Sequence, residues 1–171
     1  MRYALISDIH ANLPALEAVL ADIRSRTAPD AVLHLGDLVG YAPWPNETVS
    51  LIREAGIPGV AGNYDSTVAT DYKNCGCRAD TPRDEELAHI SFEWTRKAVT
   101  PETKVFLGGL PFRIDIKPSG GHVAGPTIVL FHATPMNNLV YGTEDRPGSF
   151  SSKMAKQAGA KVLLLGMRIP S

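Results

Sequence analysis

The chain has 171 residues and a formal net charge of −1, with 44% hydrophobic and 20% charged residues. These values are typical of one soluble globular domain that buries a core. They give no reason to expect specific binding to nucleic acid or to a membrane. No apolar run approaches the roughly 20 residues that span a bilayer, and Asp8 and His10 interrupt any signal-type apolar core at the N-terminus. We therefore expect a cytoplasmic location.

The first third of the chain alternates predicted strands and helices. Apolar runs predict strands at residues 3–7, 31–36 and 57–61. Leucine, isoleucine and valine recur at three- and four-residue spacing in residues 13–26, which predicts an amphipathic helix, and a second helix is expected at 46–54. The order βαβαβ favours a parallel sheet with right-handed crossovers.

The remainder of the chain predicts a loop, three helices and a second group of strands. Residues 66–84 are polar and irregular, as expected of a loop beside a site. The expected helices are 84–99, 101–107 and 151–158. The expected strands are 112–116, 127–131 and 161–165, with a glycine-rich hairpin loop at 118–126.

Polar side chains stand where the predicted strands end. Asp8 and His10 follow the first strand, Asp37 the second and Asn63 the third, and His132 follows the strand at 127–131. Ligands bind at this edge of open α/β sheets. Carboxylate, amide and imidazole groups gathered there suit divalent metal ions.

Each of these residues also has a purely structural interpretation. Taken singly, Asp8 fits a helix cap, Asp37 and Asn63 fit turns, and His132 fits a hydrogen-bonded core histidine. The order and placement of the whole set favour the metal site. The other histidines are not expected to bind metal: His34, His89 and His122.

The two cysteines, Cys75 and Cys77, lie two residues apart. A disulfide at this separation would be strained, and no second cysteine pair exists to complete a zinc site. A redox pair is the functional alternative. We expect two reduced thiols in a loop.

Four motifs together resemble the calcineurin-like metallophosphoesterase superfamily: Asp-x-His at 8–10, Gly-Asp at 36–37, Gly-Asn-x-Asp at 62–65 and the strand-end His132. The resemblance covers the whole chain, and segments 36–41 and 87–101, the latter with Glu-Trp-Thr-Arg at 93–96, are similar to the small bacterial and archaeal phosphodiesterase branch. It implies an α/β fold, a sandwich of two mixed β-sheets flanked by helices. The domain would be single and span residues 1–171.

The resemblance also implies two divalent transition metals, drawn from Mn, Fe, Zn, Ni or Co. Asp8 and His10 would bind the first metal, Asn63 and His132 the second, and Asp37 would bridge both. The implied reaction is hydrolysis of phosphoesters, chiefly phosphodiesters, by a metal-bridging hydroxide that attacks phosphorus in line. The expected partner is therefore a phosphoester substrate.

The implied catalytic set adds two residues to Asp37 and Asn63. Asp65 is the acidic member of the Gly-Asn-x-Asp motif. Tyr64 stands where family members carry a histidine near the leaving group. A phenol, with a pKa near 10, donates a proton less readily than an imidazole.

The chain departs from the family after its last predicted strand. The family carries Gly-His-x-His there, whereas this chain reads Gly166-Met167-Arg168. We therefore expect each metal to lack one imidazole, and the second sheet to be incomplete, with an unpaired edge that favours aggregation or a homo-oligomer. A truncated or frameshifted gene, residues missing after Gly166, or a natural variant would each explain it, and we favour the first two. An inactive scaffold or binding protein on the same fold is the alternative function.

Overall fold

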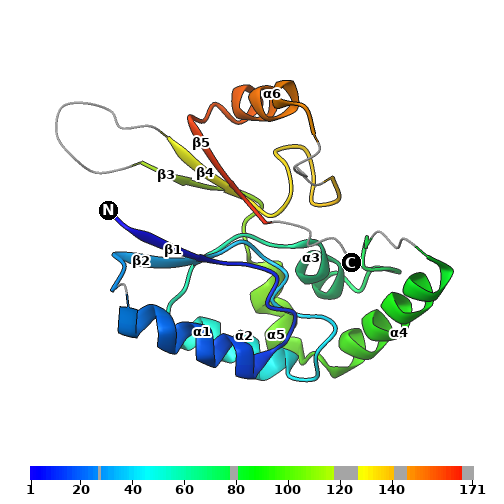
Figure 1. Cartoon of the computed structure of the whole chain (residues 1–171). Helices are drawn as coiled ribbons and strands as arrows, with labels where there is room; N and C mark the ends of the chain where they lie inside the picture. The colour runs from blue at the N-terminus through cyan, green and yellow to red at the C-terminus, as the bar shows by residue number, and fades with distance from the viewer. Residues whose placement is uncertain (27, 78–80, 118–126, 141–145, 167–171) are drawn as a thin grey trace.

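A computed structural model describes residues 1–26, 28–77, 81–117, 127–140 and 146–166. Within these residues the elements form two small sheets and six helices (Figure 1). In chain order they are β1 (Tyr3–Ile6), α1 (Leu13–Arg26), β2 (Ala31–His34), α2 (Pro45–Glu54), α3 (Asn63–Ala69), α4 (Pro82–Ala98), α5 (Pro101–Gly108), β3 (Ile114–Ile116), β4 (Ile128–Phe131), α6 (Gly148–Ala158) and β5 (Val162–Leu165). The predicted α/β architecture with two sheets is confirmed.

The first sheet pairs β1 with β2 in parallel, from Tyr3 opposite Ala31 to Ile6 opposite His34. The predicted third strand at 57–61 is wrong as a full strand, because it makes only an isolated parallel bridge between His34 and Gly59. Pro58 has no N–H to give to a ladder and Gly59 packs no side chain, so regular pairing is cut short. The segment still runs beside β2.

The second sheet is mixed, with the order β3-β4-β5. Strand β3 is antiparallel to β4, and β5 is parallel to β4. Helix α6 covers the outer side of this sheet, while α1 and α2 lie against the outer side of the first sheet (Figure 1). The described part of the chain therefore has two sheets between helical layers.

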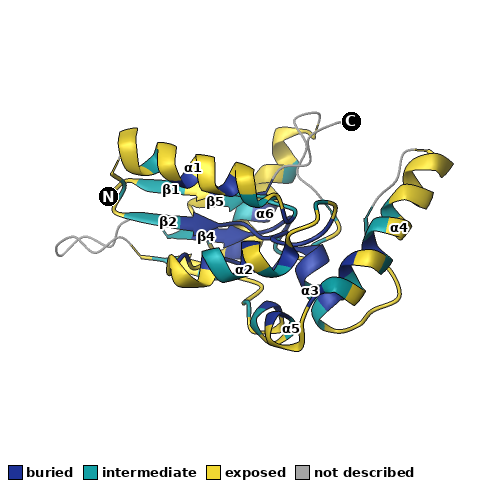
Figure 2. Ribbon diagram, turned by 90° about the horizontal axis from the view of Figure 1, so that it is seen from below, coloured by how far each residue is buried: buried dark blue, intermediate teal, exposed yellow. Residues whose placement is uncertain are grey.

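Three apolar clusters hold these layers together. The largest joins the first sheet to helices α1 to α4 and contains Ile6, Leu16, Ile52, Val68 and Phe92. A second lies between the sheets and contains Leu33, Leu35, Val60 and Leu130. A third, of Val129, Phe131 and Ala158, lies under α6. Figure 2 shows the buried strands enclosed by helices whose outer faces are exposed.

The structure corrects the extent of the predicted loop at residues 66–84. Residues 63–69 form α3, which begins directly after Gly62, and α4 begins at Pro82. Asp65 accepts a hydrogen bond from the N–H of Gly62, which supports the first turn of α3. The predicted hairpin loop at 118–126 lies outside the described residues. None of the described helices is both long and apolar enough to cross a bilayer.

Candidate metal centre

The loops that follow β1 and β2 are joined by backbone hydrogen bonds. Asp8 N–H donates to the carbonyl of Gly36 (3.1 Å), and His10 N–H donates to that of Asp37 (2.9 Å). Asp8, His10 and Asp37 all have positive φ angles, 53°, 49° and 53°, a region that disfavours L-residues other than glycine. The two loops therefore hold each other in a shape that neither would adopt alone.

All five predicted metal ligands come together at the ends of the strands. Candidate ligand atoms of Asp8, Asp37 and His132 lie within 4.8 Å of one another. His10 Nε2 lies 3.9 Å from both Asp8 Oδ1 and Asp37 Oδ2. His132 Nε2 lies 3.6 Å from Asp37 Oδ2 and 3.1 Å from Asn63 Oδ1. Asp37 is thus central to the group, between the two histidines.

Backbone carbonyls orient both imidazoles. His10 Nδ1 donates to the carbonyl of Val39 (3.2 Å), and His132 Nδ1 donates to that of Leu35 (2.7 Å). Since a carbonyl only accepts, each ring carries its hydrogen on Nδ1. In the neutral form of each ring the lone pair is then on Nε2, the atom that faces the carboxylates, as in metal-ligating histidines.

The carboxylates are arranged with similar directionality. Asp37 Oδ1 accepts from the N–H of Tyr64 (2.9 Å), so that Oδ2 is left to face the histidines. Asp8 Oδ2 accepts from the hydroxyl of Ser7 (2.5 Å), and Oδ1 is the atom nearer His10.

Burial governs the protonation of this cluster. Burial raises the pKa of Asp37 well above its usual value, and the charges of Asp65 and Asp8 raise it further. Burial lowers the pKa of His10, which favours the neutral ring. A cation bound between these groups would lower the pKa of Asp37 again, because its positive charge would stabilise the ionised carboxylate.

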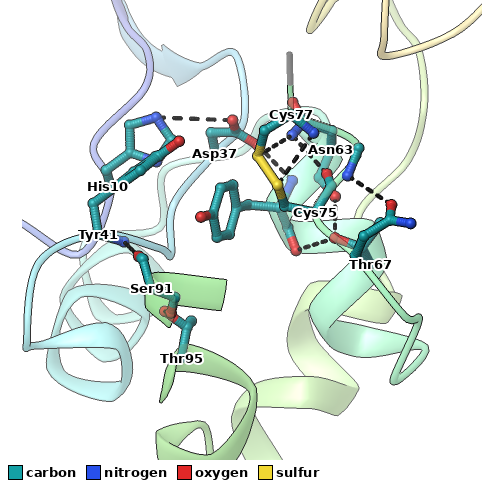
Figure 3. The surroundings of a disulfide bond; sticks show 12 residues. His10, Asp37, Tyr41, Asn63, Thr67, Cys75, Cys77, Ser91 and Thr95 are labelled. Carbon is teal, nitrogen blue, oxygen red and sulfur yellow. Dashed lines mark hydrogen bonds and ion pairs between the residues drawn. A yellow bond between two sulfur atoms is a disulfide. The ribbon is translucent and has the colours of Figure 1, made fainter. Parts of the chain in front are cut away.

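The amide of Asn63 is oriented by the loop that contains the cysteines. Asn63 Nδ2 donates to the carbonyl of Cys75 (2.9 Å; Figure 3). Its Oδ1 then faces His132. In this structure His132 Nε2 donates a hydrogen bond to Asn63 Oδ1, and without that hydrogen both atoms offer an electron pair. Two such atoms 3.1 Å apart, with a carboxylate beside them, suit a shared divalent cation. The residues present therefore fit a metal centre.

The sequence matches the family described as calcineurin-like phosphoesterase over residues 1–157. The chain belongs to this family. The resemblance expected from the four motifs is thereby confirmed.

Individual relatives agree with this assignment. The chain is 38% identical over 142 residues to an uncharacterized protein, MJ0912, of Methanocaldococcus jannaschii, covering 81% of this chain and 51% of that protein. A metallophosphoesterase from Sphaerobacter thermophilus is 29% identical, with a TM-score of 0.67 over 96% of this chain and 59% of its own. The hypothetical protein PH1004 of Pyrococcus horikoshii OT3 shares the fold, with a TM-score of 0.74 at 20% identity over 96% of this chain and 68% of its own. The chain thus spans about half the length of the curated relative it matches.

In this member of the family, the carboxylate of Asp65 points at backbone N–H groups rather than at the cluster of candidate ligands. Its Oδ1 accepts from the N–H of Leu38 (2.9 Å), and its Oδ2 accepts from that of Gly62 (3.0 Å). A Cβ added to Gly62 would lie 2.0 Å from Asp37 Oδ1. Asp65 therefore joins the loop after β2, through Leu38, to the turn before α3, through Gly62. We call this pair of hydrogen bonds the clamp, and it positions the candidate ligands.

Tyr64 is buried within a group of rings. Its ring centroid lies 5.7 Å from that of His10, 5.1 Å from that of Tyr41 and 5.8 Å from that of Phe92. Burial, first of all, raises the pKa of its phenol above the usual value. A role in proton transfer remains a prediction, and the environment of the phenol disfavours its ionisation.

The loop at 66–84 was expected beside the site, but the sequence did not predict the contacts that Tyr41 and Cys75 make there. Tyr41 is half exposed beside His10, with ring centroids 4.8 Å apart, and its N–H donates to Ser91 of α4 (Figure 3). Its place four residues after Asp37, at the end of the segment 36–41, was the available signal. For Cys75, which contributes a backbone carbonyl, no side-chain pattern could have indicated the role.

The predicted reduced state of the cysteines is wrong for this structure, which joins Cys75 and Cys77 by a disulfide. Gly76 has φ +70°, a conformation open to glycine that turns the chain tightly enough to place the flanking Cα atoms 5.2 Å apart.

The end of β5 also reaches the metal centre. The N–H of Gly166 donates to the carbonyl of His132 (2.8 Å), and a Cβ at Gly166 would lie 2.9 Å from the hydroxyl of Ser7. The expectation of missing imidazoles concerns residues 167–171, which lie outside the described part of the chain.

Proposed function

We propose that this chain belongs to a metal-dependent phosphoesterase that acts on phosphodiesters and binds two divalent transition metals. The observation that carries the proposal is the convergence of Asp8, His10, Asp37, Asn63 and His132 on one point, with both imidazole Nε2 atoms turned inward. Family membership supports phosphoester hydrolysis. The likeness of segments 36–41 and 93–96 to the phosphodiesterase branch supports the diester preference.

The residues divide between two metal positions. Asp8 and His10 would hold one metal, Asn63 and His132 the other, and Asp37 would contact both through the carboxylate that faces the two histidines. When bound, the metals would neutralise phosphate oxygens and generate a nucleophile from water near neutral pH. Oxygen and nitrogen ligands accept Mn, Fe, Zn, Ni or Co, and availability selects among them.

The protein contributes rigidity and the correct protonation state. The backbone hydrogen bonds between the two loops hold the ligands in position before the substrate arrives, so no reorganisation is needed during the reaction. Burial keeps His10 neutral and able to act as a ligand. Tyr41, half exposed at the edge of the cluster, lies where it can contact a substrate.

The test compares the wild type with Asp37→Asn on bis(p-nitrophenyl) phosphate and on p-nitrophenyl phosphate, with Mn²⁺ present. Asparagine keeps an acceptor for the N–H of Tyr64 but removes the charge that faces both metals. We expect turnover of the diester to fall by at least about 100-fold. The matched control is Asp22→Asn, the same change at an exposed position on α1, which should retain full activity.

If the wild type hydrolyses neither substrate with Mn²⁺, the proposed hydrolase activity is excluded, and the alternative of a scaffold or binding protein on the same fold remains. Faster hydrolysis of the monoester than of the diester would exclude only the diester preference.

A further inference from the structure

The loop formed by residues 74–77 is built against a candidate metal ligand. Asn63 Nδ2 donates to the carbonyl of Cys75 (2.9 Å) and lies 3.9 Å from Cys77 Sγ (Figure 3). Asn63 Oδ1 is in turn 3.1 Å from His132 Nε2. A chain of contacts therefore runs from the disulfide, through one amide group, to the second metal position.

We propose that Cys75 and Cys77 form a reversible redox modification site whose state controls metal binding by Asn63 and His132. The inference rests on the proposed metal centre and adds a chemical input to it. Its substrate class is a small thiol or a dithiol protein, which would exchange with the disulfide.

The disulfide shapes the loop that orients Asn63. Among the described residues, the hydrogen bonds of this loop stay within it or go to Asn63: Gly76 N–H donates to Asn74 Oδ1, and Cys77 N–H donates to Cys75 Sγ. The backbone shape of this loop therefore depends on the disulfide and on these internal hydrogen bonds. Cys75 is nearly buried and belongs to the largest apolar cluster, so a rearranged sulfur there has little free space.

Reduction changes this geometry directly. A thiolate of the reductant attacks Cys77 Sγ, which breaks the S–S bond and releases Cys75 as a thiolate. The second thiol of the reductant then attacks the reductant's own sulfur in this mixed disulfide and releases Cys77. The reductant leaves as a disulfide, and the chain has gained two electrons and two protons as two thiols. Two sulfurs that are no longer bonded separate to van der Waals contact. The carbonyl of Cys75 then shifts, and the amide of Asn63 loses the partner that turns its oxygen toward His132.

Cys77, which is less buried than Cys75, is the sulfur that such a reagent can reach. A hollow of about 590 Å³ borders the loop, and its lining includes Cys75 and Cys77 on one side and Glu85, His89 and Phe92 of α4 on the other. The side chain of Leu139 packs against Gly76 on the loop, where a Cβ would lie 2.6 Å from it. Exchange can therefore proceed from the α4 side without unfolding the core.

The experiment titrates Mn²⁺ into one wild-type preparation held in two redox states. One sample is oxidised with oxidised dithiothreitol; the other is reduced with a phosphine. Both are freed of reagent and metal under anaerobic conditions. Thiol titration with Ellman's reagent should find none in the first sample and two in the second, since the chain has only two cysteines. Calorimetry should then show the second Mn²⁺ binding at least tenfold more weakly to the reduced protein.

The variant Cys75→Ser/Cys77→Ser removes every thiol from the chain, so its Mn²⁺ binding should match that of reduced wild type and ignore the phosphine. If this variant fails to fold by circular dichroism, the wild-type comparison still decides. Two free thiols after oxidation, or equal Mn²⁺ binding in both states, overturns the inference.

The inference and the proposed function fail separately. Redox-dependent Mn²⁺ binding without hydrolysis would support the modification site and exclude the hydrolase. Hydrolysis with equal Mn²⁺ binding in both redox states would support the hydrolase and exclude the modification site.

Discussion

The residues of the metal centre adopt backbone conformations that most residues avoid. Five of the seven non-glycine residues with positive φ in the described chain belong to the two loops of the site: Asp8, His10, Ala11, Asp37 and Tyr41. Such conformations each cost on the order of 1 kcal/mol and persist only where surrounding contacts hold them. Here the contacts are the hydrogen bonds between the loops and the clamp formed by Asp65.

Replacing Asp65 with asparagine should loosen this clamp. The amide can accept one backbone N–H but presents a donor to the other, which leaves a buried donor unpaired. We expect the free energy of unfolding to fall by about 2 kcal/mol and Mn²⁺ binding to weaken. Urea unfolding and calorimetry measure the two effects, with Asp22→Asn as the control. A stability unchanged to within about 0.5 kcal/mol would show that Asp65 is no clamp.

His34 makes the folded chain sensitive to acid. It is fully buried, neither ring nitrogen has a hydrogen-bond partner among the described residues, and burial lowers its pKa from 6.5 to about 4. The unfolded chain therefore binds the proton more readily. The contribution of neutral His34 to the free energy of unfolding is therefore fully present above pH 6.5. It is lost as the pH falls toward 4, by about 3 kcal/mol in total.

The variant His34→Leu removes this one titration. The difference in the free energy of unfolding between variant and wild type should therefore shift in favour of the variant by about 3 kcal/mol between pH 6.5 and 4. Urea unfolding at several pH values measures it. A difference that does not vary with pH would show that His34 is not the group responsible.

At the scale of elements, helix α4 carries an exposed apolar stripe. Its first half is exposed, with Leu87 and Ile90 facing outward, and Trp94 continues the same helical spacing one turn later. Only its second half packs, through Phe92 and Thr95. The start of α4 therefore depends on local hydrogen bonds rather than on burial.

The main local bond is a capping box, in which Thr81 accepts from the N–H of Asp84 while Asp84 accepts from the N–H of Thr81. Thr81→Ala should cost about 1 kcal/mol, and Thr81→Ser should cost almost nothing. Because this turn is exposed, the loss should appear as faster amide hydrogen exchange at residues 83–88 with little change in global stability. Unchanged exchange in the alanine variant would mean that the cap contributes nothing.

At the scale of the whole molecule, the metal centre joins the two sheets. His132 comes from the end of β4 in the second sheet, and its imidazole bonds the carbonyl of Leu35, which follows β2 in the first. Asn63, at the start of α3, contacts the same imidazole. A metal bound here would therefore tie the two halves of the described chain together.

Mn²⁺ should accordingly stabilise the entire fold. At a concentration 100 times its dissociation constant, one bound ion adds about 2.7 kcal/mol, which corresponds to a rise in Tm of roughly 5–10 °C. Differential scanning calorimetry measures the shift, and a chelator should reverse it. The shift should be much smaller in Asp37→Asn and unaltered in Asp22→Asn. Equal melting temperatures with and without Mn²⁺ in the wild type would contradict a folded-state metal site.

The order of elements and the candidate ligands could be predicted from local signals. The helices at 13–26 and 46–54 follow from apolar spacing, and the strands at 127–131 and 161–165 from short apolar runs; each agrees with the structure to within a few residues. Asp8, His10, Asp37, Asn63 and His132 could be named because polar groups at strand ends meet at one sheet edge. Apolar spacing and the position of a polar residue at the end of a strand can both be read from residues that are neighbours in the chain.

Tertiary structure alone decided the contacts between segments far apart in the sequence. The clamp of Asp65 on the loop at 37–39 and the turning of Asn63 by the Cys75 carbonyl both depend on backbone atoms whose positions are set by packing. Residue type does not reveal such partners, because every residue carries the same carbonyl and nearly every residue the same N–H. The sequence by itself therefore determined which side chains supply the chemistry. The fold determined which of them converge on the candidate metal site, which of them only hold the others in place, and how the site connects to its surroundings.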